Sequence, residues 1–248
     1  MTAQAPLNVV VAQLTARSLL GGRRLWLLLA LPAVLLLLAT ITRALAGEKE
    51  GITVGLLGGF ALATVVPLLG LIVGTGAIGP EIDEGSIIYL LSKPLSRFSI
   101  ATTKVVVTVG LVAVFAALPT LLAGLILSGT TDRLAVAYAV GALVAGTAYG
   151  ALFVLLAVVT RHAVVVGLLY ALIWESLVGS FVPGAQALSI QQWALAITER
   201  ILGSRAAPLD IASAVDLSWA VPLLLVLIVG STWYAGWRLR SLRLSSDD

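Results

Sequence analysis

The chain has 248 residues, of which 60% are hydrophobic and only 11% are charged, and its mean hydropathy is +1.09. A typical soluble domain has about 45–50% apolar and about 25% charged residues, so this composition excludes a soluble globular protein and indicates an integral membrane protein. The chain has no cysteine and one histidine, which excludes disulfides, thiolate metal sites and a histidine-rich metal cluster. A net charge of +3 does not indicate binding to nucleic acid.

Residues 7–20 precede the first apolar run and are predicted to form an amphipathic helix. Apolar side chains recur there at positions i, i+3, i+4 and i+7, which are occupied by Leu7, Val10, Val11 and Leu14. Polar and basic residues occupy another face, so we expect this helix to lie in the cytoplasmic membrane interface. The pair Gly21-Gly22 then provides the bend into the membrane.

Six apolar stretches follow that are close to the length needed to span a membrane. A helix needs about 20 apolar residues to cross a hydrocarbon core about 30 Å thick. The stretches cover approximately residues 25–42, 53–78, 105–128, 134–160, 163–182 and 217–237. The predicted fold class is therefore all-α: a polytopic membrane protein with six transmembrane helices, in which residues 1–248 form a single transmembrane domain.

The distribution of lysine and arginine predicts the orientation of these helices. With a cytoplasmic N-terminus, ten basic residues lie inside and five lie outside, as the positive-inside rule requires. The inner set is Arg17, Arg23, Arg24, Lys93, Arg97, Lys104, Arg161, Arg238, Arg240 and Arg243. We therefore expect a multi-pass protein of the bacterial plasma membrane with both termini in the cytoplasm. Ala44-Leu45-Ala46 resembles a signal-peptidase site, but the preceding segments are longer than in signal peptides, so we expect the first span to be retained.

The segment 79–97, between the second and third spans, is the most informative part of the chain. Pro80 fits the first position of a helix, and acidic residues would then occupy the first turn, at the positive end of the helix dipole. Helical spacing places Ile82 and Tyr89 on one face, and Pro94 predicts the end of the helix. These residues predict a short cytoplasmic helix with an acidic start and a basic end. A solvated loop with ordinary caps explains them equally well.

This segment resembles the signature of ABC-2-type transporter permeases, in particular the permease of the nitrous-oxide-reductase maturation system. The similar residues are Glu-Ile-Asp-Glu-Gly-Ser-Ile-Ile-Tyr-Leu-Leu-Ser-Lys-Pro-Leu-Ser-Arg at 81–97, followed by Lys104. This chain has Thr103 before Lys104, where the family commonly has glycine. The six spans, the N-terminal interfacial helix and the outer helical segment also match the topology of that family.

The resemblance implies the membrane subunit of an ATP-binding cassette exporter. Two permeases would pair, as a homodimer or with a related permease, and each would dock a cytoplasmic ATPase that holds ATP and magnesium. The contact surface for the ATPase would include the N-terminal helix and the segment residues Glu81, Ile82, Asp83, Glu84, Gly85, Tyr89, Lys93, Pro94 and Arg97.

The sequence contains no phosphate-binding Gly-x-x-x-x-Gly-Lys-Ser/Thr motif, and neither His-Glu-x-x-His nor Gly-x-Ser-x-Gly occurs. We therefore expect a non-catalytic subunit that binds no cofactor itself, with membrane lipid and the ATPase as partners. The single histidine, His162, is interpreted as a polar residue of a cytoplasmic turn. An ATPase-independent secondary transporter or small channel is the alternative, although such proteins typically have inverted repeats and several polar residues at mid-membrane.

Glu175 is an acid within the fifth span, where a charge is costly and usually faces protein or a watery path. It continues a row of small residues at intervals of four, which are Gly167, Ala171 and Gly179. We expect Glu175 to face protein or a cavity, either as part of the substrate path or as a packing residue. A similar row in the fourth span, Ala142, Gly146 and Gly150, predicts close helix packing within one subunit.

The segment 183–216 is predicted to lie outside. A structureless loop of that length is unusual, and its apolar spacing predicts a helix over about 186–202 at the outer interface. This outer segment, re-entrant or interfacial, would be held at the membrane surface by Trp193.

Overall fold

The computed structural model describes residues 7–83, 85, 96–129, 133–178 and 184–241. Within these ranges every regular element is helical. The first half of the chain contains α1 (Val9–Leu20), α2 (Arg23–Ala46), α3 (Glu50–Val54), η1 (Gly55–Val65), α4 (Val66–Asp83), α6 (Arg97–Val112), η2 (Ala113–Ala117) and α7 (Leu118–Ser128). The second half contains α8 (Leu134–Val159), α9 (Ala163–Leu169), η3 (Tyr170–Val178), η4 (Ala185–Leu188), α11 (Ile190–Leu202), η5 (Gly203–Arg205), η6 (Ala207–Leu209) and α12 (Leu217–Ser241).

Five of the described helices are long and apolar enough to cross a membrane, judged by length and composition. They cover Arg24–Ala46, Glu50–Ile82, Arg97–Ser128, Leu134–Val159 and Leu217–Arg240. These are the first, second, third, fourth and sixth predicted spans, so an all-helical, multi-pass membrane protein is confirmed. The predicted fifth span is shorter in the described residues, where α9 continues into η3 as far as Val178. Six spans therefore stay a prediction.

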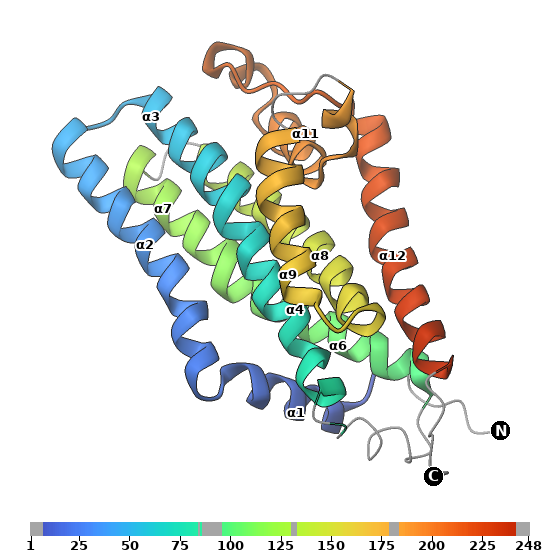
Figure 1. Ribbon diagram of the computed structural model, residues 1–248. Coiled ribbons are helices and arrows are strands. Elements are labelled where there is room, and N and C mark those ends of the chain that lie inside the picture. The colour runs from blue at the N-terminus through green and yellow to red at the C-terminus, as the bar shows by residue number, and fades with distance from the viewer. Residues whose placement is uncertain (1–6, 84, 86–95, 130–132, 179–183, 242–248) are drawn as a thin grey trace, which may run out of the picture.

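The long helices lie side by side, and α1 crosses one end of the bundle (Figure 1). We call this the α1 end; the C-terminal end of α12 also lies there, whereas α3 and α11 lie at the opposite end. Exposed tryptophans occur near helix ends, with Trp26 close to the start of α2 and Trp219 and Trp237 close to the two ends of α12. Such aromatic residues are typical of the two membrane–water interfaces.

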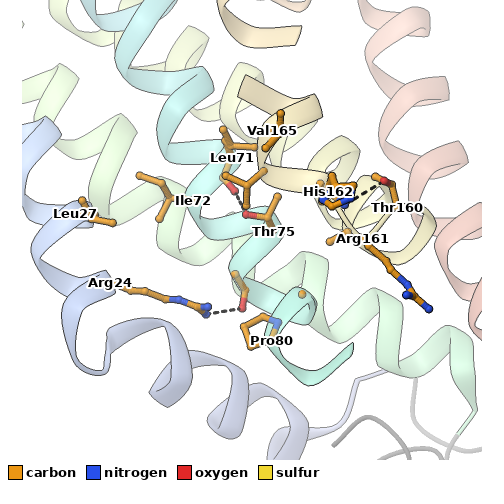
Figure 2. Close-up of a pocket in the computed structure, with 15 residues that line it drawn as sticks. Arg24, Leu27, Leu71, Ile72, Thr75, Pro80, Thr160, Arg161, His162 and Val165 are labelled. Atoms are coloured by element: carbon orange, nitrogen blue, oxygen red, sulfur yellow. Dashed lines mark hydrogen bonds between the residues drawn. The ribbon is translucent and has the colours of Figure 1, made fainter. Parts of the chain in front are cut away.

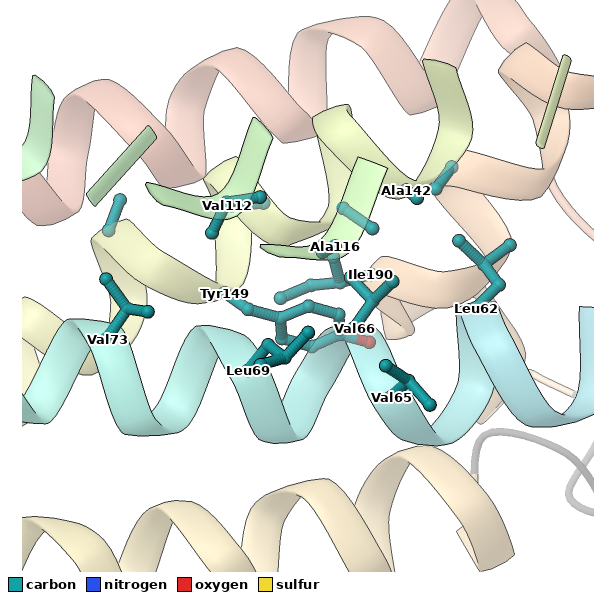
Figure 3. Close-up of a cluster of buried hydrophobic side chains, with 14 of the residues drawn as sticks. Leu62, Val65, Val66, Leu69, Val73, Val112, Ala116, Ala142, Tyr149 and Ile190 are labelled. Carbon is teal, nitrogen blue, oxygen red and sulfur yellow. The ribbon is translucent and has the colours of Figure 1, made fainter. Parts of the chain in front are cut away.

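Helix α8 is the centre of the bundle and packs against α4, α6, α7, α11 and α12. Its glycines permit this close approach: Gly150 faces Thr108, and Gly146 faces Val112 of α6. On α4, Gly70 faces the side chain of Tyr149. The predicted small-residue row therefore packs inside the chain, as expected. Figure 3 shows the resulting apolar cluster, in which α4 residues such as Leu69 and Val73 meet side chains from neighbouring helices.

Among the described residues, η1, η2 and η3 are π-helical, and the first two end two positions before a proline. η1 ends at Val65, just before Pro67, and η2 ends at Ala117, just before Pro119. Proline has no N–H and its ring collides with the carbonyl four residues earlier. A wider turn before the proline changes the hydrogen-bonding pattern there, so the helix continues through the membrane despite the missing donor.

Helix α1 confirms the predicted N-terminal helix, but the residues of its predicted apolar face are partly buried and partly exposed. The Asn8 side chain caps it by accepting hydrogen bonds from the amides of Val10 (3.0 Å) and Val11 (3.2 Å). Val11, Thr15 and Leu19 are buried against the bundle. Val10 and Leu14 are exposed, so they are placed to contact a membrane interface.

The outer segment forms a helix close to the predicted boundaries, but Trp193 points inward. Ser189 caps α11 by accepting a hydrogen bond from the amide of Gln192 at 3.3 Å. Helix α11 packs against α8 and α12. The Trp193 indole is buried and donates to the Ala187 carbonyl at 2.8 Å. The predicted membrane-anchor role of Trp193 is therefore wrong, because its hydrogen bond is made within the protein.

Candidate functional site

The segment 79–97, which is predicted to contact the ATPase, begins differently from the expectation. Helix α4 runs through Pro80 to Asp83, so Pro80 lies inside its last turns and does not start a new helix. Glu81, Ile82 and Asp83 consequently lie at the C-terminal end of a long helix, where the helix dipole does not favour acids. The helix ends before Gly85, which has a φ of +70° and donates its N–H to the Ile82 carbonyl at 3.2 Å.

Arginine 24 explains how the helix continues through Pro80. Proline cannot donate to the carbonyl four residues earlier, which is that of Gly76. That carbonyl instead accepts a hydrogen bond from Nη1 of Arg24 on α2, at 3.3 Å (Figure 2). A neighbouring side chain thus satisfies the backbone group that the proline leaves without its usual partner, as membrane helices require.

The acid at position 81 is held by a buried lysine. Lys104 of α6 has a fully buried side chain, and its Nζ donates to Oε1 of Glu81 at 2.8 Å. The same ammonium contacts the carbonyl of Ala77 at 2.5 Å and Oγ1 of Thr15 at 3.4 Å. Lys104 therefore joins α1, α4 and α6 at a single point. A buried ammonium is tolerated because it is both paired and hydrogen-bonded.

A second contact fixes α1 to α6 beside this lysine. The backbone amide of Asn8 donates to Oγ1 of Thr103 at 3.1 Å. Thr103 is buried, and it precedes Lys104 in the chain. The two neighbouring residues therefore hold both the beginning and the middle of α1 against the same helix. Sequence analysis included Lys104 in the family signature but did not predict that its charge would be buried.

The other end of the segment is attached to α12. Ser96 caps α6 by accepting a hydrogen bond from the amide of Ser99 at 3.0 Å. Arg97 donates from Nη1 to the Leu239 carbonyl at 2.8 Å, and the Arg240 guanidinium carbon lies 4.4 Å from the centre of the Phe98 ring. The Arg97 side chain is therefore held against α12. The other predicted residues of this segment, Glu84, Tyr89, Lys93 and Pro94, lie outside the described residues.

Glu175 belongs to η3, and its fully buried side chain lies beside the first residue of α11. Its Oε1 accepts hydrogen bonds from the Tyr170 hydroxyl and the Ile190 amide, both at 3.0 Å, and its Oε2 accepts one from Ser189 Oγ at 2.5 Å. The prediction that this side chain faces protein is confirmed. The positive end of the α11 dipole stabilises the carboxylate. Glu175 thus connects η3 to the helix that follows 15 positions later.

Tyr149 of α8 belongs to the same buried cluster. Its hydroxyl is buried and interacts electrostatically with Glu175, while its ring stacks on Phe153 with centroids 6.1 Å apart. Sequence analysis missed Tyr149 and Ser189, because neither belongs to a motif or to a periodic pattern with Glu175. The cluster includes a 2.5 Å charge-assisted hydrogen bond from Ser189, and together its contacts indicate a structural clamp.

A cavity of about 360 Å³ opens at the α1 end between α2, α4 and the turn that joins α8 to α9 (Figure 2). Arg24, Arg161 and His162 provide its basic groups, and Leu27, Leu71, Ile72, Val164 and Val165 are among its apolar lining residues. His162 lies in the turn as predicted, and its amide donates to Oγ1 of Thr160 at 3.2 Å. Within the described ranges, no group of three or more histidines and acids could hold a metal ion.

The fold and these sites define a multi-pass, all-helical membrane protein in which a buried lysine joins the helices of the α1 end. Compared with known proteins, the chain matches no protein-family model and no curated protein sequence.

Proposed function

We propose that this chain is the transmembrane permease subunit of an ATP-binding cassette transporter, an exporter driven by ATP that a separate cytoplasmic ATPase hydrolyses. Two such chains, or this chain and a related permease, would form the membrane part with six spans each. The α1 end would face the cytoplasm, and α9–η3 would belong to the remaining span.

The observation that carries the proposal is the resemblance of residues 81–97 and Lys104 to the ABC-2 signature. The contacts around this segment support it. A segment that transmits force from a docked ATPase must be rigidly joined to the membrane helices on both sides. Here Glu81, near the start of the segment, pairs with Lys104, and Arg97, at its end, binds the Leu239 carbonyl.

The position of α1 also supports the proposal. The helix lies across the same end of the bundle as the segment, and Lys104 binds both Thr15 of α1 and Glu81 of α4. An ATPase docked at this end would therefore contact two elements that share one buried lysine. Movement of either element would be communicated to α4 and α6.

The test is purification of the tagged chain from its native membrane under mild detergent. We expect an ATPase with a phosphate-binding loop to copurify in equal amounts, and its hydrolysis in proteoliposomes to depend on this chain. As a specificity control, an unrelated multi-pass protein carrying the same tag is purified in parallel. Transport that continues in vesicles without any ATPase would contradict the proposal and favour the ATPase-independent transporter.

A further inference from the structure

The cavity at the α1 end borders the outside of the bundle, where a membrane component can reach it. Leu27 on α2 and Val164 and Val165 on α9 line it, and all three side chains are exposed on the outside of the bundle. In a membrane protein, such exposed apolar side chains contact lipid. Arg24 lies at the start of a membrane-spanning helix and Arg161 lies in the turn between α8 and α9. These basic groups are therefore at the depth of lipid headgroups.

The charge of the cavity favours an anion. Arg24, Arg161 and His162 line it, and no aspartate or glutamate is among its described lining residues. A guanidinium carries five N–H donors, of which Arg24 uses one on the Gly76 carbonyl. Phosphate is a strong acceptor for such groups, and arginine binds it with charge-assisted hydrogen bonds.

The shape and lining distinguish a phospholipid from a free phosphate ion. The cavity volume of about 360 Å³ is within the range of small-molecule sites, about 300–1,000 Å³, and exceeds what one phosphate fills. Apolar side chains from α2, α4 and α9, such as Leu27, Ile72 and Val165, continue from the basic residues. This combination matches a charged headgroup with the first methylenes of its acyl chains.

We propose that this cavity binds one anionic phospholipid, with Arg24 holding the headgroup phosphate, Arg161 adding positive charge on the opposite side of the cavity, and the apolar walls holding the acyl chains. Basic pockets between membrane helices are a known mode of recognition of anionic headgroups. The bound lipid contacts α2, α4 and the turn between α8 and α9, so it fills the space between segments that are distant in the sequence. The proposal depends on membrane insertion and not on the proposed transport function.

The experiment measures lipid binding to the purified full-length chain in detergent, by native mass spectrometry, with phosphatidylglycerol and phosphatidylcholine as probes. We expect phosphatidylglycerol to bind and phosphatidylcholine to bind about tenfold more weakly. We expect Arg161→Gln to weaken phosphatidylglycerol binding by about fivefold, since it removes one positive charge close to the headgroup. Arg17→Gln changes an exposed arginine at the same end outside the cavity and serves as the matched control.

A second variant fills the cavity without changing any charge. Gly79 lines the cavity, and a side chain added there meets no atom within 4 Å, so Gly79→Leu occupies the space without a collision at its first carbon. We expect it to lower phosphatidylglycerol binding, whereas Gly110→Leu, at another glycine with open space, leaves binding unchanged. Arg24→Gln is informative only beside these variants, because Arg24 also supports α4.

Three results would overturn the assignment. The first is equal binding of phosphatidylcholine and phosphatidylglycerol, which would show that headgroup charge is not recognised. The second is displacement of the lipid by millimolar inorganic phosphate, which would assign the site to a free anion. The third is the same loss of binding in Arg17→Gln as in Arg161→Gln, which would place the lipid elsewhere on the basic end.

Discussion

The ammonium of Lys104 lies 2.8 Å from the carboxylate of Glu81, and this ion pair joins α6 to α4. The lysine side chain is fully buried, whereas that of Glu81 is 28% exposed. Because the ammonium also contacts Ala77 on α4 and Thr15 on α1, removal of this one residue affects three helices.

We expect Lys104→Met to destabilise the protein by about 2–3 kcal/mol. Loss of one partner of a buried pair costs about 3–5 kcal/mol, and the partial exposure of Glu81 reduces that cost. Unfolding by sodium dodecyl sulfate in micelles measures the change. Lys49→Met, at an exposed lysine at the opposite end, is the control. Equal stability of both variants would show that the buried contacts contribute nothing.

Within the segment 79–97, replacement of Glu81 is expected to have a different effect from replacement of Asp83 and Glu84. Glu81→Gln should lower stability, because its carboxylate binds Lys104 inside the protein. Asp83→Lys with Glu84→Lys should not lower stability, because basic residues suit the C-terminal end of a helix, and it should reduce ATPase stimulation if these residues face the proposed ATPase. The two measurements are unfolding in micelles and nucleotide hydrolysis in proteoliposomes. Normal stimulation by the double variant would remove these acids from the docking surface.

Replacement of Glu175 by glutamine should destabilise the protein by about 1–3 kcal/mol. The carboxylate accepts from Ser189, Ile190 and Tyr170, and an amide has only one acceptor oxygen, so at least one of these donors loses its partner. Ser189→Ala tests the same contact from the other side. In the double variant we expect less than the sum of the two losses, since the residues interact directly. Glu48→Gln, at an exposed glutamate, is the control. Full stability with lost transport would instead assign Glu175 to the substrate path.

Arg24 and Pro80 should be energetically coupled through a backbone oxygen. Arg24→Gln is expected to cost about 0.5–1.5 kcal/mol, because the Gly76 carbonyl loses its donor. In a Pro80→Ala background the restored N–H of residue 80 can donate to that carbonyl, so the same arginine change should cost less. A double-mutant cycle of unfolding free energies measures the difference. Additive losses would mean that the proline does not make the carbonyl depend on Arg24.

Replacement of a closely packed glycine of α8 should lower stability, whereas replacement of a glycine that faces open space should not. An alanine at position 150 would place its added carbon against the Thr108 side chain, and overpacking of this kind typically costs about 1–3 kcal/mol. Gly110→Ala adds the same group to α6 where no atom lies within 4 Å, and alanine favours helix more than glycine does. We expect a lower unfolding free energy for Gly150→Ala and no loss for Gly110→Ala.

The sequence alone determined the membrane-spanning character of this protein. Long apolar runs form helices in a bilayer because each backbone N–H and C=O must find a partner within its own segment. Two helices outside the spans were also predictable in part, because the apolar residues over 7–20 and near 186–202 recur at helical spacing. The small-residue row of α8 predicted close packing, because side-chain size along one face is a local property of the sequence.

The tertiary structure alone decided how the polar groups are paired. Helix α4 continues past Pro80, where the sequence predicted a new helix. Arg24, which precedes Gly76 by 52 positions, donates to the carbonyl that the proline leaves without its usual partner. Lys104 is paired with Glu81, and Glu175 stabilises the start of α11, only because the bundle brings distant segments together. Periodicity describes one helix at a time. The cost of burying a charge is offset by partners from other helices, and those partners are set by packing.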